Sequence, residues 1–273
     1  MARALFCQSS PVAYRLSVLK CQLQRRISDG CSGAKFAGER AEKPLPFLVY
    51  KSSSLIRRRL GDVDMELQEN KATNLALAAP KVTELLIRPG ETFSFWHLVG
   101  DPCAKRGYRE GLTIANGSPC RGIGGGMCQM TNLIHWLVLH SPLLITEHHH
   151  HDGYDLFPDF NRKIPFGTGT SIMYNYLDYR FYNDSACTYE LVLYSDGEYL
   201  SGELRTDKKP LRTYHITAEN QRFVREGDLV YRVGEVWRSC IDVNTGNQIF
   251  RERIRKNHAK VCYDTAGLTI SPS

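Results

Sequence analysis

Residues 122–129 read Gly-Ile-Gly-Gly-Gly-Met-Cys-Gln, and the chain then continues into a predicted helix from Met130 to His140. Four glycines in five positions allow positive φ angles and let the backbone stand close to a neighbour or a ligand. Cys128 lies at the expected start of the helix, where the helix dipole favours an anion and lowers the pKa of a thiol. Three interpretations follow: a catalytic thiol, an anion pocket without catalysis, and a turn that only packs the helix.

The flanking segments predict an α+β fold. Residues 91–96 alternate aromatic and polar side chains, as a half-buried strand does, and residues 171–182 are a second strand candidate. We expect a glycine-loop-to-helix unit packed on a mostly antiparallel sheet, followed by a β-meander. The helix would bury an apolar stripe of Met130, Leu133, Ile134 and Leu137. The meander strands are expected at residues 171–182, 189–194, 199–205, 229–237 and 248–255, with hairpin turns at residues 195–197 and 244–246.

Composition sets limits on the class of protein. The chain has 273 residues, of which 42% are hydrophobic, so it can bury a sizeable core. Its longest apolar stretch, Leu133 to Ile145, is interrupted by polar residues and is too short to span a membrane. The N-terminus lacks a secretory pattern, which predicts a cytoplasmic protein. None of the nine cysteines forms a C-x-x-C pair, so the cysteines support neither a zinc ribbon nor a dithiol redox motif, and we expect no cofactor.

Positive charge is concentrated at the N-terminus. The formal net charge is +6, yet residues 1–60 alone hold 12 Lys and Arg against three Asp and Glu, a net of +9. This distribution predicts an anionic surface or partner for the head rather than a nucleic-acid-binding protein. Leu16, Leu19, Leu23 and Ile27 recur at near-helical spacing, so the head either packs on its own domain or makes a peripheral contact with an anionic membrane.

Three regions are predicted along the chain. Residues 1–44 are expected to be a basic, weakly ordered head, because residues 28–46 are rich in Gly, Ser and Pro and interrupt any periodicity. Residues 45–205 would form a core that carries the glycine loop and a run of histidines. Residues 206–273 would be a C-terminal, β-rich extension of that core.

The histidine run is the second chemical signal, at residues 147–152. If the segment is extended, His149 and His151 share one side with Glu147, while the intervening histidines face the other way. An imidazole on one side is suited to act as a base near neutral pH. The other interpretations are a metal site and a structural edge. No H-E-x-x-H pattern or equivalent supports metal binding.

The sequence resembles the VanW family, and the likeness covers about residues 45 to 265. The motifs that carry it are Pro-Gly-Glu-Thr-Phe-Ser-Phe at 89–95, Arg-Gly-Tyr at 106–108, Gly-Gly-Gly-Met-Cys-Gln at 124–129, Glu147 with His149 and His151, and Tyr-Asp-Leu-Phe-Pro-Asp at 154–159. The four-histidine run is this sequence's own variation, and the basic head lies outside the likeness. The resemblance implies an accessory role in glycopeptide (vancomycin) resistance or cell-wall precursor metabolism.

The resemblance leaves the chemistry open, and two hypotheses compete. In the first, the protein is a Cys-dependent hydrolase or acyl-transferase, with Cys128 as nucleophile and His149 or His151, beside Glu147, as base. N–H groups of Gly124, Gly125 and Gly126, with the Gln129 side chain, would then stabilise an oxyanion. In the second, the same turn, with Arg106 or Arg109, binds an anionic cell-wall precursor or peptide-like ligand without catalysis.

Overall fold

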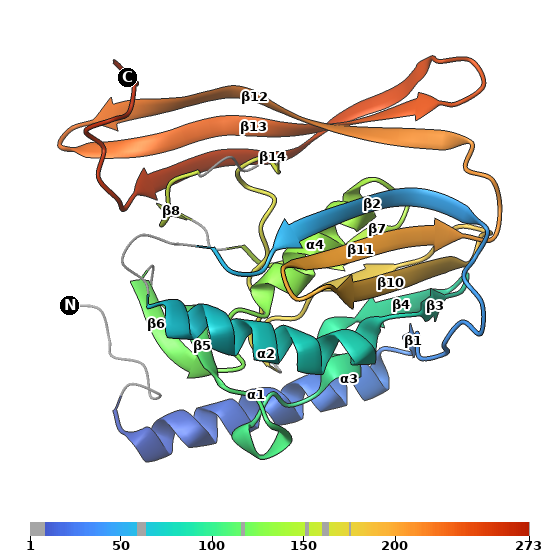
Figure 1. Cartoon of the computed structure of the whole chain (residues 1–273), viewed down its shortest axis with the longest axis horizontal. Helices are drawn as coiled ribbons and strands as arrows, with labels where there is room; N and C mark the ends of the chain where they lie inside the picture. The colour runs from blue at the N-terminus through green and yellow to red at the C-terminus, as the bar shows by residue number, and fades with distance from the viewer. Residues whose placement is uncertain are drawn as a thin grey trace.

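The computed structural model describes residues 9–58, 64–115, 118–150, 153–159, 164–174 and 176–272, and within them the predicted α+β class is confirmed (Figure 1). A compact body of helices and two sheets lies beside a third sheet of long strands. The helices are α1 (Pro11–Cys31), α2 (Met65–Val82), α3 (Phe95–Val99), α4 (Cys128–Leu139) and a short 3₁₀ turn, η2 (Ala104–Arg106).

Two four-stranded sheets form the body. The first has the order β1-β4-β9-β7, with parallel pairing only between β1 and β4. The second has the order β2-β11-β10-β3 and is antiparallel throughout. Their bounds are β1 Lys35–Phe36, β4 Glu91–Ser94, β9 Arg180–Tyr182 and β7 Leu144–Glu147, then β2 Phe47–Leu55, β11 Tyr199–Thr206, β10 Tyr189–Ser195 and β3 Leu85–Ile87.

The third sheet contains only the later part of the predicted meander, because the strands expected at residues 189–194 and 199–205 pair in the second sheet as β10 and β11. The strand Arg212–Glu226 was not predicted. The order of the third sheet is β15-β12-β13-β14-β8, and the three central strands pair antiparallel over 14 or 15 residues each. The bounds are β12 Arg212–Glu226, β13 Leu229–Asp242, β14 Gln248–Val261, β15 Ile270–Pro272 and β8 Tyr154–Asp155. A separate hairpin pairs β5 (Glu110–Ala115) with β6 (Ser118–Ile123).

Helix α4 is the centre of the body, and its predicted apolar stripe is confirmed. Met130, Leu133, Ile134 and Leu137 are each at most 1% exposed. The helix packs against β2 and β11. It comes close to the sheet at Gly202 of β11, where an added Cβ would lie 3.0 Å from Leu137 Cδ1. The absence of a side chain at residue 202 therefore sets the spacing between α4 and the sheet.

Two strand predictions need correction. Residues 171–182 do not form one strand, because Met173 and Leu177 exchange backbone hydrogen bonds across a tight turn and only Arg180–Tyr182 joins a sheet. The strand expected at residues 91–96 stops at Ser94, whose side chain accepts a hydrogen bond from the His97 N–H and caps α3. A local capping bond therefore overrides the alternating pattern.

The N-terminal head also differs from its prediction. In the described part of residues 1–44, α1 is a continuous helix, with Ser10 as its N-cap and Pro11 at its first position. Ala13 and Ala37 are 4% and 1% exposed, and β1 adds a parallel strand beside β4. The described head is thus ordered against the body. Among the described residues, no helix combines the length and apolar character needed to cross a bilayer.

Candidate functional site

The glycine turn is closely packed against its neighbours. Gly124 and Gly126 have φ angles of +75° and +86°, which favour glycine. A Cβ on Gly125 would lie 2.2 Å from the carbonyl carbon of Gly111, and one on Gly126 would lie 2.3 Å from Cγ of Lys71. The turn therefore needs glycines so that β5 and α2 can approach it. This contact supports the packing interpretation of the turn.

Helix α2 holds the turn through the buried Asn74. The Asn74 side chain donates to the carbonyl oxygens of Gly125 (2.9 Å) and Arg109 (3.0 Å), and its Oδ1 accepts from the Arg109 N–H (2.8 Å). One turn earlier, Lys71 is 6% exposed and donates to Gln68 Oε1 at 2.7 Å. Burial, followed by the nearby Arg58 and Arg57, lowers the pKa of Lys71 to about 7.

The surroundings of Cys128 do not match those of an activated thiol. The residue begins α4 as predicted and is half-buried as a whole, but its Sγ is densely surrounded. Burial raises the pKa of the thiol, and a hydrogen bond from the Ile172 backbone only partly opposes this effect. The pKa therefore moves in the direction opposite to the one expected at a helix N-terminus. Among the described residues, no hydrogen bond joins Cys128 Sγ to an imidazole.

The side chains predicted to bind a ligand, Gln129, Arg106 and Arg109, do not face a common site. The Gln129 amide donates to the carbonyl of Leu55 (2.8 Å) and to Ser54 Oγ (3.0 Å), so it ties α4 to β2 rather than facing an oxyanion. Arg106 is exposed and donates to the Asp101 carbonyl at 3.3 Å. Arg109 bonds Asn74 through its backbone, while its residue as a whole is exposed. These contacts do not gather the three side chains into one site.

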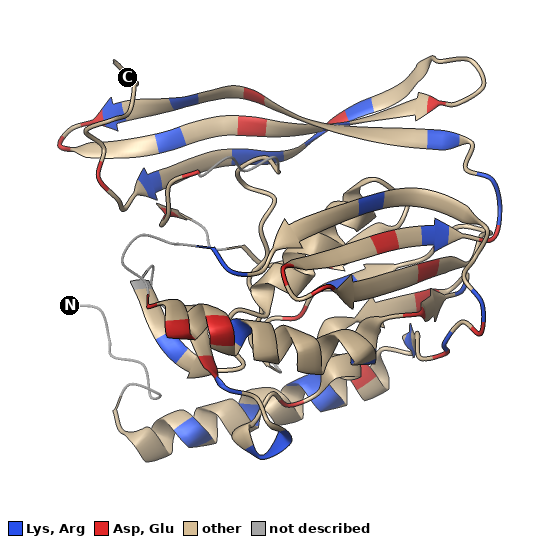
Figure 2. Cartoon of the chain, viewed as in Figure 1, with Lys and Arg blue, Asp and Glu red and all other residues tan. Residues whose placement is uncertain are grey.

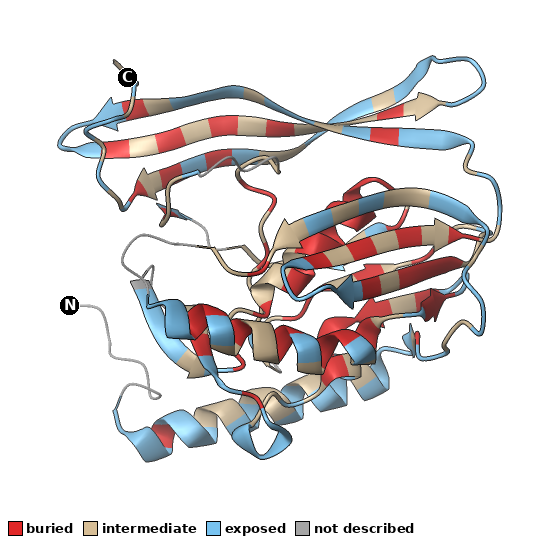
Figure 3. Cartoon of the chain, in the orientation of Figure 1, coloured by how far each residue is buried: buried red, intermediate tan, exposed pale blue. Residues whose placement is uncertain are grey.

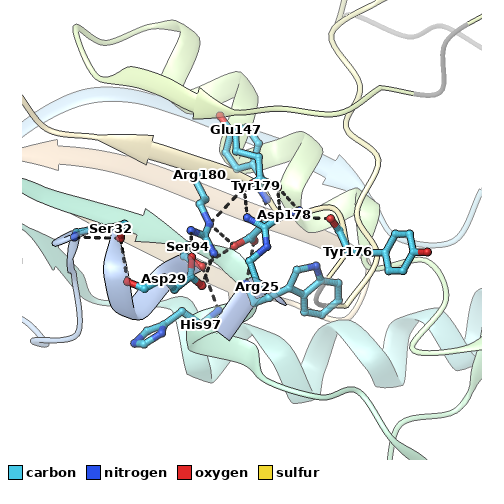
Figure 4. Close-up of polar contacts among 12 residues, drawn as sticks. Arg25, Asp29, Ser32, Ser94, His97, Glu147, Tyr176, Asp178, Tyr179 and Arg180 are labelled. Carbon is cyan, nitrogen blue, oxygen red and sulfur yellow. Dashed lines mark hydrogen bonds and ion pairs between the residues drawn. The ribbon is translucent and has the colours of Figure 1, made fainter. Parts of the chain in front are cut away.

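Glu147 belongs to an ion-pair network that joins α1 to the body (Figure 4). Its two oxygens accept from Arg25 at 2.6 and 2.7 Å, and Oε1 also accepts from the Asp178 N–H at 2.9 Å. His149 Nε2 lies 3.0 Å from the same oxygen. Burial alone would raise the pKa of Glu147, but the hydrogen bonds from Arg25, Asp178 and His149 lower it to about 2. Glu147 is therefore ionised at neutral pH and anchors the N-terminal helix.

The same network continues through Arg180 on β9. Its Nη atoms donate to both carboxylate oxygens of Asp29 on α1, at 2.7 and 2.9 Å, and its Nε donates to Asp178 at 2.7 Å. Asp178 also accepts from Ser94 Oγ at 2.5 Å. These carboxylates hold the pKa of the Arg180 guanidinium above its usual range, against the effect of burial. The network fixes the end of α1 against the first sheet.

His148 of the histidine run joins an aromatic cluster with His135 and Tyr179. His148 stacks on His135 of α4 with ring centroids 4.3 Å apart, and its Nε2 lies 2.9 Å from the Gly169 carbonyl. Burial lowers the pKa of His135 well below its usual value, so this ring is neutral, and its Nδ1 lies 3.0 Å from the Tyr179 hydroxyl. The described residues contain no group of three His, Cys, Asp or Glu placed to bind a metal ion. His151 lies outside the described residues.

A cavity of about 650 Å³ lies where α4 and β7 face the third sheet. Arg212, Arg238 and Arg255 line it together with His148. Arg238 packs over the Tyr214 ring, with its guanidinium carbon 4.6 Å from the centroid, and donates to the Ser141 carbonyl at 2.8 Å. Its Nε is buried and has no hydrogen-bond partner among the described residues. These arginines belong to strands without a motif, so no local sequence signal distinguishes them from other surface arginines.

The lining of the cavity also includes two acidic side chains. Asp184 and Glu252 both line it, and Glu252 lies 3.6 Å from Arg238 Nη1 with half of its side chain exposed. Three arginines against two carboxylates give the lining an excess of positive charge. Such a cavity is suited to an anionic ligand that carries hydrogen-bond groups.

The chain, with its α+β fold and its glycine turn at the start of a buried helix, is similar to the proteins of one family. Residues 70–205 match the family model of VanW like protein. The chain is 37% identical over 249 residues to "Vancomycin B-type resistance protein VanW" of Enterococcus faecalis (strain ATCC 700802 / V583), covering 89% of each chain. It is 27% identical over 118 residues to "Uncharacterized protein YoaR" of Bacillus subtilis (strain 168), covering 42% of this chain and 36% of that protein.

The chain therefore belongs to the VanW family, which confirms the resemblance seen in its motifs. The match to the Enterococcus protein is longer than residues 45–265, and only eight residues follow position 265. The similarity therefore extends into residues 1–44, which corrects the expectation that the head lies outside it. No solved structure matches the chain.

Proposed function

We propose that the protein is an accessory factor of vancomycin resistance that binds an anionic, peptide-like cell-wall precursor without cleaving it. The resistance role comes from the name of the Enterococcus relative, which matches the chain over 89% of its length. The binding role rests on one observation, the arginine-lined cavity between α4, β7 and the third sheet. We keep the cytoplasm as the proposed location.

The size and chemistry of the cavity support this assignment. A volume of about 650 Å³ is within the range of about 300–1,000 Å³ that small-molecule sites occupy. The Arg238 guanidinium is held in place by the Tyr214 ring and the Ser141 carbonyl, so it is oriented before a ligand arrives. The Arg238 side chain lines the cavity and keeps 12% of its surface exposed, so the exposed part of its guanidinium can meet a ligand carboxylate or phosphate.

Calorimetric titration with a synthetic peptidoglycan stem pentapeptide tests the binding role. We expect the peptide with a free C-terminal carboxylate to bind, and its C-terminal amide to bind much more weakly. Arg238→Gln should weaken binding about tenfold or more, because a charged hydrogen bond is lost. Arg212→Gln should weaken it less. Arg225→Gln is the matched control, since Arg225 lies on the same strand as Arg212, is exposed and is outside the cavity lining.

Equal affinity for the acid and the amide would refute anion recognition at this site. Unchanged affinity in both cavity variants would refute the location. Mass spectrometry of the peptide after incubation shows whether a bond was cleaved, and cleavage would restore the hydrolase or acyl-transferase hypothesis.

Alkylation of Cys128 separates binding from thiol catalysis. Because burial raises the pKa of this thiol, we expect iodoacetamide to modify the exposed Cys31 and Cys120 first. Cys128→Ser should retain the fold and complement resistance in cells. Preferential alkylation of Cys128 at neutral pH, together with loss of complementation, would instead establish a nucleophile.

A further inference from the structure

Helix α1 carries an apolar stripe that faces away from the body. Val12, Leu16, Leu19, Leu23 and Ile27 are 53–66% exposed, although each is a large hydrophobic residue. Figure 3 shows α1 as mostly exposed along its length, in contrast to α2 and α4. At about 100° per residue, these five side chains occupy an arc of about 80° on the helix surface. They form one continuous stripe about 15 residues long.

The opposite side of α1 is the side that the body uses. Arg25 pairs with Glu147, and Asp29 pairs with Arg180, from positions well away from the stripe around the helix. Figure 1 shows α1 along one edge of the molecule, with the body on one side only. The ion pairs therefore fix the direction in which the stripe points.

Basic residues border the stripe on both sides. Arg15 and Arg26 lie along one border and Lys20 along the other, and all three are exposed. Figure 2 shows Lys and Arg in blue along the length of α1. Asp29 is the one acidic residue in the sequence of α1, and Arg180 already neutralises it. The outward surface of α1 is thus apolar in the middle and positively charged at its borders.

This charge pattern decides which partner fits. A second copy of α1 would place cations opposite cations along the borders of the stripe, which is destabilising. The stripe also covers only about two heptads, which is short for a helix pair held together by its own contacts. An anionic bilayer surface, in contrast, accepts the leucines among its acyl chains and the basic borders among its headgroups.

We propose that the outward surface of α1 binds the protein to an anionic membrane surface, with the helix lying in the plane of the interface. The ion pairs to Glu147 and Arg180 keep the helix attached to the body while its apolar stripe enters the lipid. This contact is separate from the arginine-lined cavity and does not depend on it.

Co-sedimentation of the full chain with vesicles tests the proposal. We expect binding to vesicles that contain phosphatidylglycerol, weak binding to vesicles of phosphatidylcholine alone, and weaker binding as salt is added. The double variant Leu19→Ser, Leu23→Ser should lower the partition coefficient about tenfold or more. Replacing Arg15, Lys20 and Arg26 with Gln should lower it about a hundredfold.

The control is Leu211→Ser, because Leu211 is 63% exposed and lies between β11 and β12, away from α1. It should bind vesicles as the wild type does. All substituted side chains are exposed, so circular dichroism should show unchanged folding. Absence of wild-type binding to the anionic vesicles, or equal binding by the α1 variants, would overturn the proposal. So would a wild-type dimer in analytical ultracentrifugation that the double leucine variant converts to monomer.

Discussion

Replacing Glu147 with Gln tests whether this carboxylate holds the fold together or takes part in chemistry. Its pKa falls from 4.5 to about 2 because Arg25, the Asp178 N–H and His149 stabilise the ionised form against burial. With about 1.4 kcal/mol for each pH unit, the charged form contributes about 3 kcal/mol to stability at pH 7. The Glu147 side chain is only 16% exposed, so solvent screening reduces this value little.

The stabilisation by Glu147 should depend on pH in a defined direction. A carboxylate with a depressed pKa stabilises the fold above pH 4.5, and this contribution is lost as the pH falls toward 2. We therefore expect Glu147→Gln to lose about 3 kcal/mol in urea denaturation at pH 7, and about half of that at pH 3. Glu110→Gln, at an exposed position on β5, should lose less than about 0.5 kcal/mol at both pH values.

A loss below about 1 kcal/mol at pH 7, or a loss that does not change with pH, would refute this account of Glu147. A variant of unchanged stability that no longer supports resistance would point instead to a role in catalysis or binding.

Two further changes test the packing and the acid response. Gly125→Ala should lower the free energy of unfolding by about 3 kcal/mol or more, because its Cβ would meet the Gly111 backbone. Gly197→Ala is the control and should lower it by about 1 kcal/mol, because it is strained only by a φ of +91°. Thermal unfolding of both variants compares the two losses. Burial lowers the pKa of both His135 and His140, the latter to about 4, so acid destabilises the wild type through both rings. His140 alone should account for about 2 kcal/mol of the stability lost between pH 7 and pH 5, as the unfolded chain takes up its proton. His140→Gln should remove most of this loss in urea denaturation, and an equal pH response in both proteins would contradict the assignment.

Local patterns predicted the parts of the fold that depend on local physics. The apolar spacing of Met130, Leu133, Ile134 and Leu137 identified α4 and its buried face, and the turns at residues 195–197 and 244–246 located the hairpins. Side-chain periodicity encodes which face is buried, and turn residues encode where the chain reverses. These features need no knowledge of distant residues.

The candidate site was harder to predict because its contacts are long-range. Arg25 and Glu147 are 122 residues apart, and no local pattern pairs them. For the same reason, the head was expected to be weakly ordered although α1 forms ion pairs with the body. Cys128 was placed correctly at a helix N-terminus, but the direction of its pKa shift is set by burial of the thiol, which spacing does not show.

The residue at position 202 constrains which side chains can stand opposite it on β10 and α4. A Cβ at this position would lie 2.9 Å from Leu193 Cδ2, 3.0 Å from Leu137 Cδ1 and 3.3 Å from Leu133 Cδ2. A larger residue at 202 therefore fits only if a facing leucine becomes shorter or α4 moves outward. We expect the lineages of this family to change residue 202 together with 133, 137 or 193, so that substitutions far apart along the chain accumulate in pairs.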